Sequence, residues 1–272
     1  MTAYPLTWLY APGDRPHVVV KALTSGADVV VIDLEDAVPP DRKAYARAAT
    51  AELLTDRPPV PVHVRVNAPG GWGEQDIAAL VGTPGLSGLR LPKVTSAAEI
   101  VHVARRTART DLYALLETAL GVEQAYAVAT AHPRLRGISL GEADLCADLG
   151  VRDGTGLDWS RSRVVVAARA AGLPPPAQSV HPDIHDQEGL AASCAHGRAL
   201  GFLGRAAIHP RQLPVIERAY LPDEKEIEQA ETVLKAAAVE QGAQALPDGR
   251  FIDAAMVTAA RRTLSMARPR PR

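Results

Sequence analysis

Short apolar runs typical of β-strands alternate with amphipathic helical patterns along most of this 272-residue chain. This alternation favours a parallel sheet covered by helices. The expected strands are Leu6–Ala11, Val29–Leu34, Val60–Val66, Gly88–Leu91, Leu112–Leu116, Gly137–Leu140, Gln178–Val180 and Gly204–Ile208. The expected helices include Pro16–Ser25, Asp41–Leu54, Ala97–Ala108, Val122–Ala131, Arg161–Ala171 and Asp186–Leu200. Since a (β/α)8 TIM barrel typically takes about 250 residues, we predict this α/β fold, with a doubly wound open sheet as the alternative.

Near its C-terminal end the sequence loses this alternation. A long helix is expected over about Asp223–Gln241, then a turn or short hairpin over Gly242–Gly249, and a last helix over about Asp253–Met266. We therefore predict a barrel domain over residues 1–222 and a C-terminal helical extension over residues 223–272. The extension would either cover the barrel mouth as a lid or reach across to a neighbouring subunit.

Charge and composition argue against several classes of protein. The formal net charge of −1 disfavours a dedicated nucleic-acid-binding protein. No apolar run approaches the about 18 residues of a membrane span, and the N-terminus lacks the pattern of a secretory signal. Cys146 and Cys194 have neither the spacing of a metal site nor that of a redox motif. We expect a soluble cytoplasmic protein with neither membrane nor nucleic-acid partners.

One predicted strand, Val29–Leu34, leads directly into a cluster of carboxylates, Asp33, Glu35 and Asp36. Unpaired carboxylates in a dry site are costly, so this cluster implies a metal ion, an arginine or a cationic ligand nearby. Catalytic groups of a (β/α)8 barrel lie at the C-terminal ends of its strands. The cluster therefore marks the expected active site, with Asp33 assigned to the packing of the strand end.

Polar residues recur at the same place after the other predicted strands. They are Asp14, Arg15, Arg65, Asn67, Lys93, Glu117, Glu142, Asp144, His181 and His209. Glu117 and Asp144 follow consecutive strands, and two carboxylates with water and a bidentate substrate suit Mg²⁺. Two acids neutralised by arginines at the barrel rim remain the alternative. We expect His181 and His209, each followed by proline, to support the site rather than act as bases.

Basic residues near these strand ends supply positive charge. Arg65 and Lys93 can hold oxygens of a substrate or pair with the acidic cluster, and both roles can coexist. Arg15 precedes a helix that begins with proline and whose N-terminus suits an anion. The helix after the acidic cluster carries Arg42, Lys43 and Arg47, which would meet phosphates or form a solvated basic face.

These motifs, in this order, resemble those of the HpcH/HpaI aldolase and citrate lyase β-subunit family, specifically its CitE-like acyl-CoA lyases. The matching segments span nearly the whole chain and are Leu9–Gly13, Ile32–Val38, Val64–Asn67, Leu91–Lys93, Leu116–Gly121, Gly141–Leu145 and Ala207–Pro210. The resemblance implies a Mg²⁺-dependent barrel that makes or breaks a carbon–carbon bond next to a thioester. The implied partners are a CoA thioester and a small oxo acid.

The resemblance also implies roles for individual residues. Glu117 and Asp144 correspond to the Mg²⁺ ligands, and Arg65 to an arginine that binds substrate oxygens during catalysis. Glu35 and Asp36 correspond to an acidic pair that organises water around the metal and positions that arginine. Further substrate contacts are expected from Gly141, Glu142 and Ala143, and contacts to CoA from Arg15, Arg47 and Lys93.

The tail segment Asp248–Asp253 resembles the lid of CoA-thioester lyases, which places Asp253 at the catalytic acid/base. In such relatives this aspartate acts in the active site of a neighbouring subunit, commonly in a trimer, so a homo-oligomer is implied. The chain departs from its relatives in two ways. Arg205 stands where they often carry lysine, and the chain is shorter than the malyl-CoA lyases, so their substrate is not transferred.

The implied reaction is reversible Claisen-type cleavage of a 3-hydroxyacyl-CoA to acetyl-CoA and an oxo acid. Malyl-, citramalyl- and 3-hydroxy-3-methylglutaryl-CoA are all compatible substrates. Three alternatives remain: a citrate lyase β-subunit acting on a citryl-carrier thioester, a CoA-independent Mg²⁺ aldolase of 4-hydroxy-2-oxo acids, and a catalytically silent CoA-binding or scaffold protein. The sequence leaves the acyl group and the preferred direction open.

Overall fold

The structure, a computed structural model, describes residues 4–107, 109–239, 244–245 and 251–267. These residues fall into two compact units. The larger unit comprises Pro5–Ile216, and the smaller unit comprises Tyr4 with the described residues from Glu217 onward. The domain boundary after residue 222 stays a prediction.

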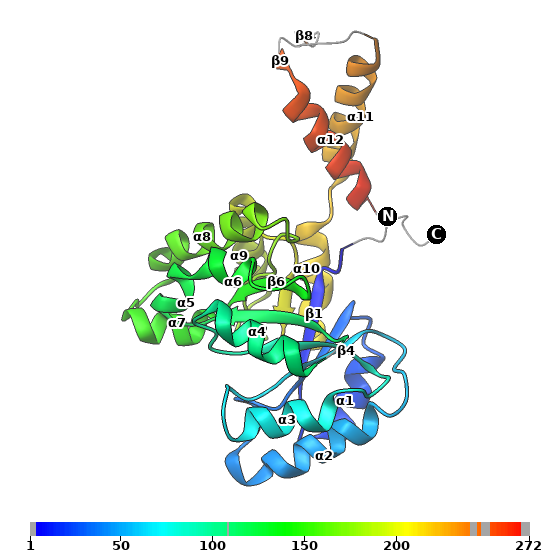
Figure 1. The fold of residues 1–272 in the computed structure, drawn as a ribbon. Coiled ribbons are helices and arrows are strands. Elements are labelled where there is room, and N and C mark those ends of the chain that lie inside the picture. The colour runs from blue at the N-terminus through cyan, green and yellow to red at the C-terminus, as the bar shows by residue number, and fades with distance from the viewer. Residues whose placement is uncertain (1–3, 108, 240–243, 246–250, 268–272) are drawn as a thin grey trace. The chain divides into compact units, whose positions relative to one another are not determined.

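The larger unit is built on a curled sheet of seven parallel strands with helices around it (Figure 1). The strands are β1 (Thr7–Pro12), β2 (Val29–Asp33), β3 (Val62–Arg65), β4 (Leu86–Leu91), β5 (Asp111–Leu116), β6 (Leu135–Leu140) and β7 (Arg205–Ala207). Their order in the sheet is β6-β5-β4-β3-β2-β1-β7. Neighbours in sequence are thus neighbours in space, as in consecutive strands of a barrel.

Helices follow most of the strands, as the alternation predicts. They are α1 (Pro16–Leu23), α2 (Lys43–Leu53), α3 (Trp72–Leu80), α4 (Ala97–Arg106), α5 (Ala119–Glu123), α6 (Ala125–Ala129), α7 (Glu142–Leu149), α8 (Asp158–Ala170), α9 (Gln187–Leu200) and α10 (Leu213–Tyr220). Short 3-10 helices are η1 (Pro40–Arg42), η2 (Gly154–Leu157) and η3 (Pro210–Gln212). The single helix predicted over Val122–Ala131 is replaced by the two short helices α5 and α6.

Both faces of the sheet are buried, which explains the continuous apolar runs in its strands. Every residue of β2 is buried, and Val30, Val31 and Ile32 are each 0% exposed. Parallel sheets covered on both sides select such β-branched runs. One face packs against the helices, while Trp8, Val29, Val31 and Ala177 form a cluster on the other. The core thus holds the strand ends in fixed positions.

The predicted strand Gln178–Val180 forms only one isolated parallel bridge, between Gln178 and Arg205. Its pairing with β7 consists of two hydrogen bonds, from the Gln178 N–H to the Gly204 carbonyl and from the Ala206 N–H to the Gln178 carbonyl, and prolines flank the segment on both sides. Among the described residues, no ladder joins this segment to β6. The larger unit is therefore an α/β fold with a curled seven-stranded sheet, and its full closure as an eight-stranded barrel remains a prediction.

The smaller unit is a helical hairpin with a short two-stranded sheet. Its elements are α11 (Glu224–Val239), β8 (Gln244–Ala245), β9 (Phe251–Ile252) and α12 (Ala254–Met266), and β8 pairs antiparallel with β9. Ala230, Val233, Ile252 and Ala260 form its buried core. Most of the predicted turn Gly242–Gly249 lies outside the described residues. No helix in the described part of the chain has the length and apolar character needed to cross a membrane.

Candidate active site

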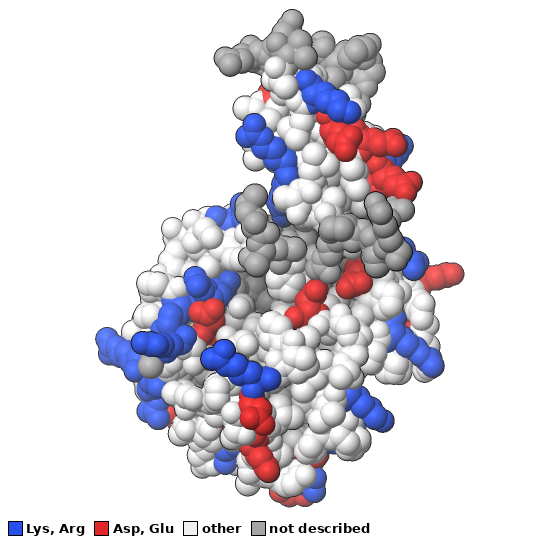
Figure 2. Space-filling model, turned by 90° about the vertical axis from the view of Figure 1, so that its right-hand side faces the viewer, with Lys and Arg blue, Asp and Glu red and all other residues white. Residues whose placement is uncertain are grey.

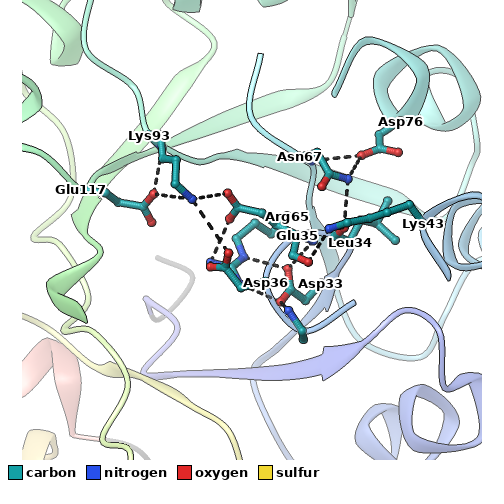
Figure 3. A network of polar contacts seen from close by, with 11 residues as sticks. Asp33, Leu34, Glu35, Asp36, Lys43, Arg65, Asn67, Asp76, Lys93 and Glu117 are labelled. Atoms are coloured by element: carbon teal, nitrogen blue, oxygen red, sulfur yellow. Dashed lines mark hydrogen bonds and ion pairs between the residues drawn. The ribbon is translucent and has the colours of Figure 1, made fainter. Parts of the chain in front are cut away.

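The carboxylate of Asp33, at the end of β2, holds the guanidinium of Arg65, at the end of β3 (Figure 3). Arg65 donates from Nε to Asp33 Oδ1 at 2.8 Å and from Nη2 to Oδ2 at 2.7 Å. The two residues are register partners on adjacent strands. Asp33 also accepts the backbone N–H groups of Glu35 and Ala37. It therefore fixes the acidic turn and the arginine together.

Arg65 lies at the centre of three carboxylates. Besides Asp33, its Nη1 lies 3.2 Å from Glu35 Oε2 and 3.2 Å from Asp36 Oδ2. The ring centroid of Tyr10 is 5.5 Å from the guanidinium carbon. Burial would lower the pKa of Arg65, but the hydrogen bonds and charge of Asp33 outweigh it and raise the pKa. Arg65 is thus a rigidly held cation at the strand ends.

Lys93 connects this cluster to Glu117. Its backbone φ of +53° is uncommon for a residue other than glycine, and such strain is kept where the surroundings enforce it. In this conformation its N–H donates to Glu117 Oε2 at 2.9 Å, and its Nζ donates to Glu35 Oε1 at 2.6 Å. Burial would lower the pKa of Lys93, but the hydrogen bond to Glu35 and nearby carboxylates raise it. Lys93 therefore joins two acids from different strands.

Glu117 follows β5 and is 2% exposed. Burial, and then the negative charge of Glu35, raises the pKa of this carboxyl to about 7. A Cβ at position 141 would collide with Glu117 Cγ and Oε1, so only glycine lets the loop after β6 approach so closely. Glu117 is thus held against the backbone in a site that disfavours its charge unless a cation is present.

The first turn of α7 carries the predicted Glu142, Ala143 and Asp144. Glu142 pairs with Arg161, whose Nη2 lies 2.6 Å from Glu142 Oε2. The carboxylate of Asp144 has no hydrogen-bond or ion-pair partner in the part of the chain that the structure describes. It lines the same cavity as Glu117, and its charge contributes to the raised pKa of Glu117. Asp144, unlike Glu142, is free to bind a ligand.

A cavity of about 460 Å³ opens between these groups, within the usual size range of small-ligand sites. Its polar lining includes Asp33, Asp36, Arg65, Glu117, Glu142 and Asp144. Gly141 and Ala143 also line it, so the structure brings together most of the predicted site residues. On the molecular face shown in Figure 2, acidic and basic side chains are interspersed.

The charges around this cavity suit a divalent cation. The charged residues that line the cavity are five carboxylates, Asp33, Asp36, Glu117, Glu142 and Asp144, and two arginines, Arg65 and Arg90, which leaves a formal charge of −3. No group of three or more His, Cys, Asp and Glu in the described residues is arranged to hold a metal. Two carboxylates with water and substrate oxygens nevertheless fit the octahedral preference of Mg²⁺. Glu117 and Asp144 are the residues that would hold it.

Mg²⁺ affinity is expected to fall at acidic pH. A proton and Mg²⁺ compete for Glu117, and its pKa of about 7 means that the proton already occupies it below neutrality. Affinity should drop about tenfold per pH unit below pH 7 and change little above it. Calorimetric titrations with Mg²⁺ between about pH 6 and about pH 8, at constant ionic strength, measure this dependence. A pH-independent affinity would contradict it.

The structure places two of the predicted phosphate-binding residues in structural roles. Arg47 donates from Nε to Asp76 Oδ1 at 2.7 Å, and its side chain is 14% exposed. Lys43 is buried and donates to the backbone carbonyls of Leu34 and Glu35. Burial lowers the pKa of Lys43. Lys43 and Arg47 therefore do not form a solvated basic face. Each binds a buried acceptor that is distant in sequence and that only the fold brings close.

Replacing Arg47 by methionine should destabilise the protein without weakening CoA binding. Asp76 is 0% exposed and would lose its cationic partner, so the free energy of unfolding should fall by about 3 kcal/mol. Urea unfolding measures this loss, and the exposed Arg57→Met is the matched control. A raised KM for a CoA thioester with unchanged stability would instead restore Arg47 as a CoA contact.

The remaining predicted residues lie at the surface or support loops. Arg15 is largely exposed, with its Nε 4.0 Å from Asp14 Oδ1, and stays available to a ligand. His209 caps η3 by accepting the N–H of Arg211. His181 Nε2 lies 3.6 Å from Asp186 Oδ2. Asp253 caps α12 by accepting the N–H of Met256 at 2.8 Å, so one of its oxygens is engaged.

Two further residues organise the site: Asn67, which the sequence placed at a strand end and which holds a loop, and Arg161, which sequence reasoning missed. Asn67 Nδ2 donates to the Leu34 carbonyl at 2.9 Å and to Asp76 Oδ2 at 2.6 Å, and thereby connects the acidic turn to α3 (Figure 3). Arg161, on α8, neutralises Glu142. Asn67 is recognisable in the sequence because it is a polar residue shortly after a predicted strand. The residues next to Arg161 in the sequence do not indicate that it pairs with Glu142.

Comparison with known proteins identifies relatives of this chain. Residues 6–210 match the profile of the HpcH/HpaI aldolase/citrate lyase family. The chain is 37% identical over 270 residues to a (3S)-malyl-CoA thioesterase of Cereibacter sphaeroides, covering 95% of this chain and 93% of the relative. It is 38% identical over 270 residues to a citrate lyase subunit beta-like protein of Mycobacterium tuberculosis, covering 96% and 94%.

Solved structures give the same result. The fold is similar to that of CitE from Mycobacterium tuberculosis in complex with magnesium, acetoacetate and coenzyme A, with a TM-score of 0.84, 36% identity and 98% of each chain covered. It is also similar to the citrate lyase beta subunit of the same organism complexed with oxaloacetate and magnesium, with a TM-score of 0.70, 36% identity, and 81% of this chain and 98% of that one covered. The chain belongs to the HpcH/HpaI aldolase/citrate lyase family, a family of carbon–carbon lyases with magnesium-binding members.

Proposed function

We propose that this protein is a Mg²⁺-dependent lyase that cleaves a 3-hydroxyacyl-CoA thioester to acetyl-CoA and an oxo acid, in a reversible Claisen-type reaction. The proposal rests on the cavity that Glu117, Asp144 and Arg65 line together. The charged residues of its lining carry an excess of negative charge. A divalent cation and an oxygen-rich substrate would complete this site. The ligands of the similar CitE structure, magnesium, acetoacetate and coenzyme A, support the same chemistry.

In this mechanism Glu117 and Asp144 would hold Mg²⁺, which when bound would supply Lewis-acid polarisation of the substrate oxygens at the carbon where the bond breaks. Arg65 donates to the same oxygens and stabilises the negative charge that develops there. Its position is set before substrate arrives, because Asp33, Glu35 and Asp36 already hold the guanidinium. Gly141 and Ala143 also line the cavity and would contact the substrate.

Asp253 is the proposed acid/base. In the cleavage direction, the 3-hydroxyl group loses its proton to solvent and its oxygen becomes the carbonyl oxygen of the oxo acid. The electron pair of the breaking carbon–carbon bond passes to the thioester as an enolate, and Asp253 gives a proton to the methylene carbon of this enolate to form acetyl-CoA. We propose that Asp253 acts in the site of a neighbouring subunit, within a homotrimer or an assembly of trimers. The smaller unit would then serve as a lid on a complete (β/α)8 barrel. A cytoplasmic location and CoA contacts from Arg15 and Lys93 belong to the same proposal.

A product assay tests this function. The protein is incubated with Mg²⁺ and a panel of malyl-, citramalyl-, 3-hydroxy-3-methylglutaryl- and citryl-CoA, and products are identified by mass spectrometry. The proposal expects acetyl-CoA and an oxo acid in equal amounts, with no reaction when EDTA removes the metal. Absence of both products from every thioester, with metal bound, would overturn it.

Thioester hydrolysis is the second candidate, because one similar relative is named a malyl-CoA thioesterase. Hydrolysis releases free CoA and a hydroxy acid instead of acetyl-CoA, so the same assay separates the two reactions. A citryl-carrier substrate and a free 4-hydroxy-2-oxo acid, added as further members of the panel, test the citrate lyase subunit and the CoA-independent aldolase.

A further inference from the structure

Arg90 is a buried arginine without an acidic partner. It lies on β4, between Leu89 and Leu91, and is 4% exposed. Its side chain donates no hydrogen bond and forms no ion pair in the part of the chain that the structure describes, and its buried Nε is unsatisfied. A buried guanidinium without an anion is costly. Arg90 therefore lacks the counter-ion that its location requires.

The guanidinium of Arg90 contacts two aromatic rings. Its guanidinium carbon lies 5.9 Å from the ring centroid of Trp8 and 5.5 Å from that of Tyr113. Tyr113 stacks on His63, at a centroid distance of 4.4 Å. Burial, and then the charge of Arg90, lowers the pKa of His63 well below its usual value, so this imidazole stays uncharged. These contacts orient the guanidinium but do not neutralise it.

Arg90 lines the cavity that also contains Arg65, Glu117 and Asp144. It is the register partner of Arg65 on the neighbouring strand. The lining of the cavity also includes Trp8, whose ring faces the Arg90 guanidinium. The acids of the lining, Glu117 and Asp144 among them, form no ion pair with Arg90 in the described residues. One cavity thus offers a metal-binding group of acids and, separately, an unneutralised arginine.

We propose that Arg90 binds a second carboxylate of the substrate, so that the site selects 3-hydroxyacyl thioesters whose oxo-acid product is a dicarboxylate. The inference rests on the proposed function for the first carboxylate, which belongs at the metal and Arg65. A planar guanidinium matches a carboxylate in a two-point contact, and the apolar walls strengthen that contact. A substrate whose product has only one carboxylate would leave the charge of Arg90 unpaired.

The hydroxy acids malate and lactate provide a matched pair of probes. Both carry a hydroxyl next to a carboxylate, and malate adds only the second carboxylate. Calorimetry in the presence of Mg²⁺ should show that malate binds the wild-type protein at least about tenfold more tightly than lactate. Arg90→Met should remove most of this preference and leave the affinity for lactate unchanged. Arg90→Lys, which keeps the charge, should retain part of it.

Arg136→Met is the matched control, because this strand arginine is exposed and pairs with Asp111 instead of lining the cavity. It should leave the ratio of the two affinities unchanged. Equal binding of malate and lactate by the wild-type protein would overturn the inference. So would an equal loss of both affinities in a folded Arg90→Met variant, since that is the result of a purely structural role.

Condensation of acetyl-CoA with oxaloacetate or pyruvate separates this inference from the proposed function. These oxo acids again differ by one carboxylate. Equal turnover of both would overturn the role of Arg90 while the lyase function stands. If neither is turned over but an Arg90-dependent preference for malate remains, the lyase function fails and the carboxylate site holds.

Discussion

Glu117→Gln is expected to abolish magnesium-dependent cleavage, lowering kcat/KM by about 10³-fold or more. The amide keeps the size of the side chain, so the close packing against Gly141 is preserved. It removes the negative charge that a hard divalent cation requires, however, and leaves Asp144 as the only carboxylate of the pair. The loss should appear in Mg²⁺ affinity and in turnover together.

Two measurements make this prediction specific. Calorimetric titration with Mg²⁺ reports the metal site directly, and a coupled assay for acetyl-CoA reports turnover. Glu52→Gln is the matched control, because Glu52 is exposed on α2, and it should behave as the wild type. If Glu117→Gln retained wild-type turnover with unchanged Mg²⁺ dependence, Glu117 would not be a metal ligand.

The alternation of strands and helices predicted the positions of the main site residues well. Arg65, Lys93 and Glu117 each follow an apolar strand, and parallel strands bring their C-terminal ends to the same edge. Their convergence around Glu35 therefore follows from topology, before any side-chain contact is known. The role of Asp33 as a support for the strand end was predictable for the same reason.

Contacts between helices were not predictable in this way. Arg47 and Lys43 lie four residues apart on α2, a spacing that equally suits a solvated basic face. Only the fold shows that Asp76 on α3 faces Arg47. The backbone of Lys93 is a second example, because nothing in its local sequence requires a positive φ.

Arg90 could have been recognised from the sequence as a candidate site residue. A charged residue between Leu89 and Leu91, inside a strand buried on both faces, breaks the apolar pattern that such strands otherwise keep. The alternation of side chains along a strand places residue 90 on the opposite face from its two neighbours. The pattern alone could not name its partners, since Trp8 and Tyr113 come from other strands.

Asp253→Asn is expected to lower kcat by about 10³-fold while Mg²⁺ affinity stays at the wild-type value. Asparagine caps a helix about as well as aspartate, so α12 and the thermal stability of the protein should be retained. The amide cannot exchange the proton that the carboxyl supplies. Full turnover by this variant would remove Asp253 from the mechanism.

Mixing the two variants tests whether Asp253 serves a neighbouring subunit. Asp253→Asn and Glu117→Gln chains are each inactive alone, but a mixed oligomer contains sites that combine an intact Glu117 with an intact Asp253 from the next subunit. If each site takes its aspartate from one neighbour in a closed ring, random mixing in equal amounts restores about a quarter of the wild-type activity. If Asp253 served its own subunit, every site in the mixture would lack one of the two groups, and the mixture would remain as inactive as its components.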